Sequence, residues 1–122
     1  MGCFKKKVEL IEKSFSDCRN WNNGHFYSMD YSEITKALIK YRVNVLKHYG
    51  FGDYLLHAKN DEETIECIIH EAAKGWSSYF DPNSLIILRR ANIGSSAYKK
   101  ASNIKVPILK VLAKTDQVIN VN

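Results

Sequence analysis

The chain has 122 residues, of which 45% are hydrophobic, 11% aromatic and 25% charged, and its net charge is +5. This length suits a single domain with one core, and this share of aromatic residues excludes a disordered chain. No apolar run approaches the roughly 18 residues that a membrane-spanning helix needs, so the sequence predicts no membrane span.

The charge is distributed unevenly along the chain. Residues 1–52 carry a net charge of +4, residues 53–84 carry −5 and residues 85–122 carry +6. Such asymmetry is typical of a surface that binds nucleic acid or an acidic partner. It also arises where an acidic helix lies beside basic neighbours of the same chain, and both interpretations stay open.

The three cysteines are too few and too scattered for a disulfide framework, and none has the spacing of a zinc ligand. They predict free thiols in an intracellular, reducing compartment (cytoplasm or nucleus), and Cys67 is expected to be buried within a helix. The N-terminal residues MGCFKKK are similar to an acylation signal. Lys6 stands where N-myristoylation requires Ser or Thr, so a basic helix start is the favoured interpretation.

The first part of the chain predicts two helices joined by a loop. Residues 4–15 have apolar side chains at helical spacing, and residues 20–25 (NWNNGH) predict a loop in which Trp21 covers the core. Asp30 and Glu33 have the spacing of a capping box. They predict the start of a second helix, which should end at a glycine, Gly50.

The rest of the chain predicts strands that alternate with helices. Residues 54–58 (YLLHA), 85–88 (LIIL) and 106–112 (VPILKVL) have the length and apolar character of strands, and 81-DPN-83 predicts a turn. Asn60 or Asp61 should cap the helix between the first two strands. This order predicts a single α/β domain with a small, mainly parallel sheet of about three or four strands flanked by helices. Residues 1–28 would form a helical and loop extension, and residues 29–122 the core.

The candidate binding residues lie at the end of the second predicted strand and in the segment that follows it. Two adjacent arginines at the carboxyl end of a strand favour a phosphate or carboxylate ligand. A helix that starts at Ser95 or Ser96 would add free backbone N–H groups for an anion. The full candidate set is Arg89, Arg90, Ser95, Ser96, Lys99, Lys100 and Lys105.

Catalytic residues are harder to find in the sequence. Glu66 and His70 lie four residues apart on the predicted acidic helix, and His57 follows the first predicted strand. These three residues could serve acid–base chemistry, as in a small nuclease or hydrolase. The chain has no Gly-rich phosphate loop, no zinc-protease motif and no nucleophile motif, so the sequence predicts no cofactor and no metal site.

The stretch 85–112 resembles the second half of a BRCT repeat, a module of DNA-repair and ligase proteins. The matching residues are an apolar run (85-LIIL-88), a helix with serines and Ala101 (95-SSAYKKASNI-104), and a strand with Pro107 (106-VPIL-109). The resemblance implies strand, helix and strand in that order, and an anion-binding set of Arg89, Ser95, Ser96, Lys99 and Lys100. Ala97 stands where the family's helix often carries a phosphate-binding lysine.

Together these features favour a non-enzymatic binding module. Its basic C-terminal face would bind nucleic acid or an acidic or phosphorylated protein. The alternative is a small inhibitor or immunity-type protein that docks on another protein.

Overall fold

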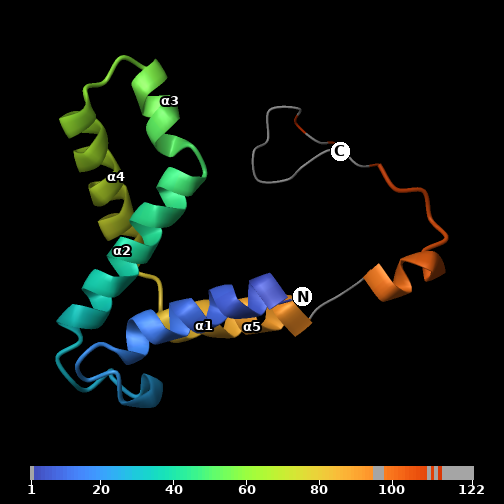
Figure 1. Ribbon diagram of the computed structural model, residues 1–122, viewed down its shortest axis with the longest axis horizontal. Helices are drawn as coiled ribbons and strands as arrows, with labels where there is room; N and C mark the ends of the chain where they lie inside the picture. Colours follow the sequence, from blue (N-terminus) through green and yellow to red (C-terminus); the bar gives the residue numbers. More distant parts are fainter. Residues whose placement is uncertain (1, 95–97, 110, 112, 114–122) are drawn as a thin grey trace.

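The computed structural model describes residues 2–94, 98–109, 111 and 113, and every regular element within these ranges is a helix (Figure 1). The elements in chain order are α1 (Gly2–Ser16), η1 (Asn22–Gly24), α2 (Ser32–His48), α3 (Phe51–His57), α4 (Glu62–Ser77), α5 (Pro82–Gly94) and η2 (Tyr98–Asn103). The predicted α/β fold is therefore wrong, because the described residues form no strand and no sheet.

The helices form two packed pairs. Helices α2 and α4 lie side by side, with α3 joining the far ends of the two, while α1 and α5 lie side by side across the other end of α2 (Figure 1). The ribbon shows α1 and α5 running in opposite directions. Within the described ranges, no helix combines the length and the apolar character that crossing a membrane requires.

The predicted strand 54–58 is instead the greater part of α3. Gly50 has a left-handed backbone with φ of 75°, which ends α2 as predicted, and its carbonyl then accepts the first α3 hydrogen bond from the Tyr54 N–H. Leu55 packs against Ile65 and Ile69 of α4. A helix pairs its own backbone groups locally, whereas a strand at this position would need a neighbouring strand.

The predicted strand 85–88 lies within α5. Asp81, assigned to a turn, is the N-cap of this helix, because its Oδ2 accepts a hydrogen bond of 2.9 Å from the Ser84 N–H. Pro82 occupies the first helical position, where no backbone donor is needed. Four consecutive apolar residues on a helix must point in several directions, so two face the core and two face outward.

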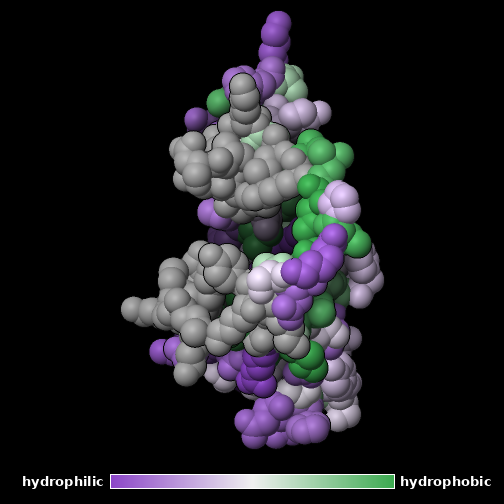
Figure 2. All heavy atoms as spheres, turned by 90° about the vertical axis from the view of Figure 1, so that its right-hand side faces the viewer, coloured by the Kyte–Doolittle hydropathy of each residue, from purple (hydrophilic) through white to green (hydrophobic). Residues whose placement is uncertain are grey.

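The predicted strand 106–112 is wrong as well, because its described residues, 106–109 and 111, adopt no strand structure. The short helix η2 lies where a longer helix starting at Ser95 or Ser96 was expected, and both serines lie outside the described residues. The fold that the BRCT resemblance implies is therefore wrong too. Residues 104–109, which follow η2, are set apart from helices α1–α5 (Figure 1). Figure 2 shows this side of the molecule, with strongly hydrophobic residues in open view.

Local side chains accept hydrogen bonds at the starts of α4 and α2, although the α2 start differs from the prediction. Asp61 caps α4 as predicted, accepting a 2.8 Å hydrogen bond from the Thr64 N–H. The predicted capping box of α2 does not form. Asp30 accepts a bond from the Ser32 N–H, but Glu33 reaches the Arg19 N–H at 2.9 Å and so ties the end of α1 to the start of α2.

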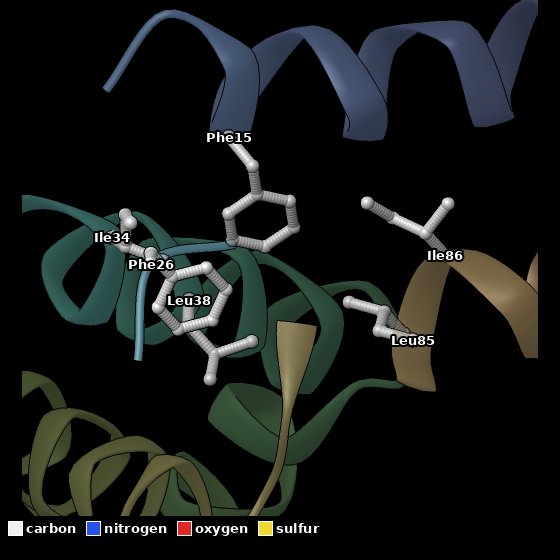
Figure 3. Close-up of a cluster of buried hydrophobic side chains, with 6 residues drawn as sticks. All are labelled: Phe15, Phe26, Ile34, Leu38, Leu85 and Ile86. Atoms are coloured by element: carbon white, nitrogen blue, oxygen red, sulfur yellow. The ribbon is translucent and has the colours of Figure 1, made fainter. Parts of the chain in front are cut away.

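A cluster of six buried side chains joins α1, α2 and α5 (Figure 3). It consists of Phe15, Phe26, Ile34, Leu38, Leu85 and Ile86, which point toward one another in the close-up. The Trp21 ring stacks on Phe15 at 5.6 Å and on Phe26 at 5.3 Å between ring centroids. Trp21 therefore covers the core, as the sequence predicted.

Candidate functional site

The two predicted arginines of α5 point to different helices. Arg89 donates from Nη2 to the Tyr41 hydroxyl of α2 at 2.9 Å, and Arg90 donates from Nε to Glu12 Oε1 of α1 at 2.6 Å. Both therefore hold α5 against its neighbours. The paired arginines expected at the edge of a sheet are not found, because the sheet does not form and a helix separates adjacent side chains by about 100°.

The other predicted binding residues are only partly described. Lys99 and Lys100 lie in η2, whereas Ser95 and Ser96 fall outside the described residues. Lys105 is exposed, and its Nζ donates to the carbonyl of Ser102 at 3.1 Å. Arg89, Arg90 and Lys105 are thus the predicted residues whose side chains are described, and each contacts a different partner.

The pair of Glu12 and Arg90 has an electrostatic consequence. The hydrogen bond from the Arg90 guanidinium holds the pKa of Glu12 below its usual value of 4.5, and the same bond raises the pKa of Arg90. A carboxyl group whose pKa is lower in the folded state stabilises the fold above its unfolded pKa. That stabilisation disappears as the pH falls through the lowered, folded-state pKa.

We expect Arg90→Gln to lower the free energy of unfolding at neutral pH slightly, since Arg90 is exposed and exposed ion pairs contribute little to stability. The difference from the wild type should shrink toward zero as the pH falls well below 4.5, because Glu12 is then protonated in both proteins. Urea unfolding across a pH series measures this. Lys40→Gln, which removes an exposed lysine on α2 that has no ion pair among the described residues, is the matched control and should show no such acid-dependent difference. A constant difference at all pH values would contradict the prediction.

The three residues considered for catalysis are not joined to one another in the described structure. Both carboxylate oxygens of Glu66 accept hydrogen bonds from Lys47 Nζ of α2, at 2.6 and 2.9 Å. His70 lies 4.0 Å from Glu71, and His57 is exposed at the end of α3. In the described part of the chain, no hydrogen bond or ion pair joins these three residues, and no group of His, Cys, Asp and Glu side chains is arranged to hold a metal ion.

The described cysteines differ from expectation. Cys67 is exposed, so the prediction of a buried thiol is wrong: the apolar stripe of α4 runs through Ile65, Ile69 and Ala73 and leaves position 67 facing outward. Cys18 is partly buried and donates from Sγ to the carbonyl of Ser14 at 3.3 Å. Burial raises the pKa of the Cys18 thiol, so it stays protonated at neutral pH.

A cleft that the sequence did not reveal lies between α2 and the segment that joins α4 to α5. Its volume is about 280 Å³. Three tyrosines on its rim are strongly exposed: Tyr27 at 63%, Tyr31 at 48% and Tyr79 at 77%. The apolar side chains that line it are Phe26, Ile34, Leu38, Phe80 and Pro82. The cleft therefore combines an apolar lining with three exposed tyrosines.

A hydrogen-bond network fixes one wall of this tyrosine cleft. The Tyr27 hydroxyl donates to Asp81 Oδ1 at 3.0 Å. Asn83 Nδ2 donates to the Tyr27 hydroxyl and to the carbonyl of Gly24, each at 2.9 Å. An amide has two N–H donors, so this side chain can serve both acceptors at once. The loop that carries Tyr27 is thereby joined to the start of α5.

The loop itself is shaped by residues that accept positive φ. Asn20, Asn22, Asn23 and Gly24 have φ values of 65°, 44°, 54° and 91°. Asparagine tolerates the left-handed region better than most residues, and glycine adopts it without a steric cost. The sequence NWNNGH therefore forms the predicted loop, and its tight turns bring Phe26 into the core and leave Tyr27 beside Asp81.

Sequence reasoning missed this cleft because its walls are distant in the chain. The stretches 26-FYSMDY-31 and 79-YFDP-82 each place aromatic residues beside residues that start a helix. That local pattern gives no sign that the two stretches meet, since only the packing of α2 against α4 brings them together.

No family model matches the chain, and neither a curated protein nor a solved structure is significantly similar to it. Its function must therefore be inferred from its own side chains.

Proposed function

We propose that the chain is a non-enzymatic binding module that docks on another protein through the tyrosine cleft. The observation that carries this proposal is the exposure of Tyr27, Tyr31 and Tyr79 around one apolar cleft. Tyrosine is enriched in protein interfaces because its ring offers a large contact area and its hydroxyl offers a hydrogen bond. Such aromatic anchors carry much of the binding energy of an interface.

The way the cleft is built supports this role. Tyr27 is held by Asp81 and Asn83, so little of its conformational freedom remains to be lost on binding. Phe80 of the cleft lining stacks on Trp76 at 4.3 Å, and the Arg42 guanidinium lies 4.9 Å from the centre of the Trp76 ring. These contacts help to hold Phe80 in place.

The test compares two exposed tyrosines. We expect Tyr79→Ala to weaken binding of the partner protein by about tenfold or more, as truncation of an interface anchor does. Tyr54→Ala is the matched control, because Tyr54 is 67% exposed but lies on α3, away from the cleft. Tagged forms of the wild type and both variants are used to isolate partners from cells, and the affinity is then measured by calorimetry with the purified partner.

The proposal fails if no stoichiometric protein partner is found, or if Tyr79→Ala and Tyr54→Ala bind it equally well. Circular dichroism of each variant shows that the fold is intact. Tyr79→Phe adds a second measurement, since it keeps the ring and should retain most of the affinity.

A second candidate function is nucleic-acid binding by the C-terminal third. It is favoured by the net charge of +6 over residues 85–122 and by Lys105, which is exposed and bonded to a carbonyl instead of a carboxylate. Binding of labelled DNA and RNA across a salt series addresses it, because phosphate contacts weaken steeply as the salt concentration rises. Affinity that is absent at low salt, or that does not change with salt, rules this candidate out.

The proposal includes an intracellular, reducing setting. Cys67 is a free thiol exposed on α4, and Cys18 is also free. Exposed free thiols persist where the compartment keeps them reduced.

A further inference from the structure

Helix α5 has an apolar surface that the rest of the described chain leaves uncovered. Leu85 and Ile86 are buried in the core, whereas the next two residues, Ile87 and Leu88, are 62% and 60% exposed. A helix with apolar side chains on all sides is normally covered on all sides. Large exposed apolar patches on a small protein mark interaction surfaces. The outer side of α5 therefore needs a partner.

The same chain carries an apolar segment that is also uncovered. In residues 104–109 the side chains of Ile104, Val106, Ile108 and Leu109 are between 46% and 89% exposed. Figure 2 shows hydrophobic residues in full view on the side of the molecule where this segment lies. Pro107 disfavours a helix here, and the backbone bends at Val106. The segment is thus an apolar strip that the described residues leave uncovered.

The strip is long enough to cover part of the helix. Six residues span at most about 20–22 Å when fully extended, and the bend at Val106 shortens this span. The thirteen residues of α5 form a rod of about 20 Å. The chain leaves η2 in a direction that carries the strip away from its own α5 (Figure 1). The strip of one copy is therefore free to lie along α5 of another.

One charged group on each side has no ion pair among the described residues. A groove of about 630 Å³ between α1 and α5 is lined by two carboxylates, Glu9 and Glu12, and by two cations, Lys13 and Arg90. Glu12 is paired with Arg90, whereas Glu9 is exposed and has no ion pair among the described residues. The strip carries Lys105, whose Nζ contacts only a backbone carbonyl among the described groups. Lys105 of one copy is suited to pair with Glu9 of the other.

We propose that two copies of this chain form a symmetric dimer in which the strip, residues 104–109, of each copy covers α5 of the other. The large side chains buried would be Ile87, Leu88, Ile104, Val106, Ile108 and Leu109 of both copies. At about 60–120 Å² per side chain, they bury roughly 700–1,400 Å² of apolar surface, which approaches the size of a specific interface once polar neighbours are added. The dimer uses none of the tyrosines of the cleft, so it stands independently of the docking function.

The first test is the concentration dependence of mass, measured by sedimentation velocity. The wild type should dimerise. Leu109→Ser and Ile87→Ser should each raise the dimer dissociation constant by about tenfold or more, because each variant removes two large apolar side chains from the dimer. Leu56→Ser is the matched control: this residue is 56% exposed on α3 and should leave the dimer unchanged. All substituted side chains are exposed, so the fold should persist, and circular dichroism verifies it.

The second test reverses the charges of the proposed pair. Glu9→Lys and Lys105→Glu should each weaken the dimer, and the double variant should restore it. A photo-crosslinker at position 109, in a mixture of isotopically labelled and unlabelled chains, should give mixed products that join the strip of one chain to α5 of the other.

Three results would overturn the proposal: a wild type that stays monomeric at all concentrations, a dimer that is insensitive to Leu109→Ser, or crosslinks confined to single chains. A wild type that is monomeric by itself, and whose strip is covered only by a different protein, also overturns it.

Discussion

Replacing Phe15 by alanine should lower the free energy of unfolding by about 3–5 kcal/mol. Phe15 is fully buried, at 0% exposure, and it comes from α1 to meet residues of α2 and α5 (Figure 3). Its ring also stacks on Trp21. Truncation removes these contacts and leaves a cavity that the surrounding helices cannot fill completely. The variant therefore loses the transfer free energy of the ring, and the cavity destabilises it further.

Urea unfolding followed by circular dichroism measures this effect. Leu56→Ala is the control, since Leu56 is 56% exposed on α3 and its truncation should change the free energy of unfolding by no more than about 0.5 kcal/mol. If Phe15→Ala leaves no folded protein to measure, Phe15→Leu should give an intermediate loss because it keeps part of the apolar volume. Equal effects at positions 15 and 56 would show that α1 does not pack on the core as described.

The sequence predicted those elements whose signals are local. Gly50 ends α2 with a left-handed backbone, and Asp61 caps α4 through Thr64, because caps depend on residues only a few positions apart. The loop at residues 20–25 and the covering position of Trp21 were also predicted, since asparagine and glycine tolerate positive φ better than other residues do.

The strands were mispredicted for a physical reason. A run of four apolar residues such as 85-LIIL-88 fits a buried strand as well as a helix that is apolar on all sides. The start signal at Asp81 and Pro82 decides between the two, because aspartate before proline is a good N-cap and first helical residue. The same residues also fit a turn, and a turn before residues 85–88 is compatible with a strand.

The sequence predicted less of the candidate site than of the fold. Arg89 and Arg90 are adjacent in the chain, and only the helix that they share turns one toward Tyr41 and the other toward Glu12. Tyr27 and Tyr79 are far apart in the chain, and only the packing of the helices brings them to one cleft. Neither outcome has a signature in composition or spacing, because both depend on tertiary structure.

Gly24→Ala should lower the free energy of unfolding by about 2–5 kcal/mol, although it adds a single methyl group. Gly24 has φ of 91°, a conformation that costs an L-residue about 1–2 kcal/mol. A Cβ at this position would lie 2.5 Å from Asn83 Oδ1, so the Asn83 side chain must move. That movement breaks its bonds to the Gly24 carbonyl and the Tyr27 hydroxyl, at a further cost of about 1–3 kcal/mol.

The matched control, Gly75→Ala, should change the free energy of unfolding in the opposite direction. Gly75 lies within α4, and a Cβ there would meet nothing within 4 Å, so Gly75→Ala should raise the free energy of unfolding by about 0.5–1 kcal/mol. Urea unfolding of both variants gives the comparison, and a loss at Gly24 no larger than the change at Gly75 would contradict the described loop. Because Asn83 also holds Tyr27 at the cleft, Gly24→Ala should weaken partner binding as well, whereas Gly75→Ala should not. The residue that shapes the loop thus links the stability of the fold to the proposed docking surface.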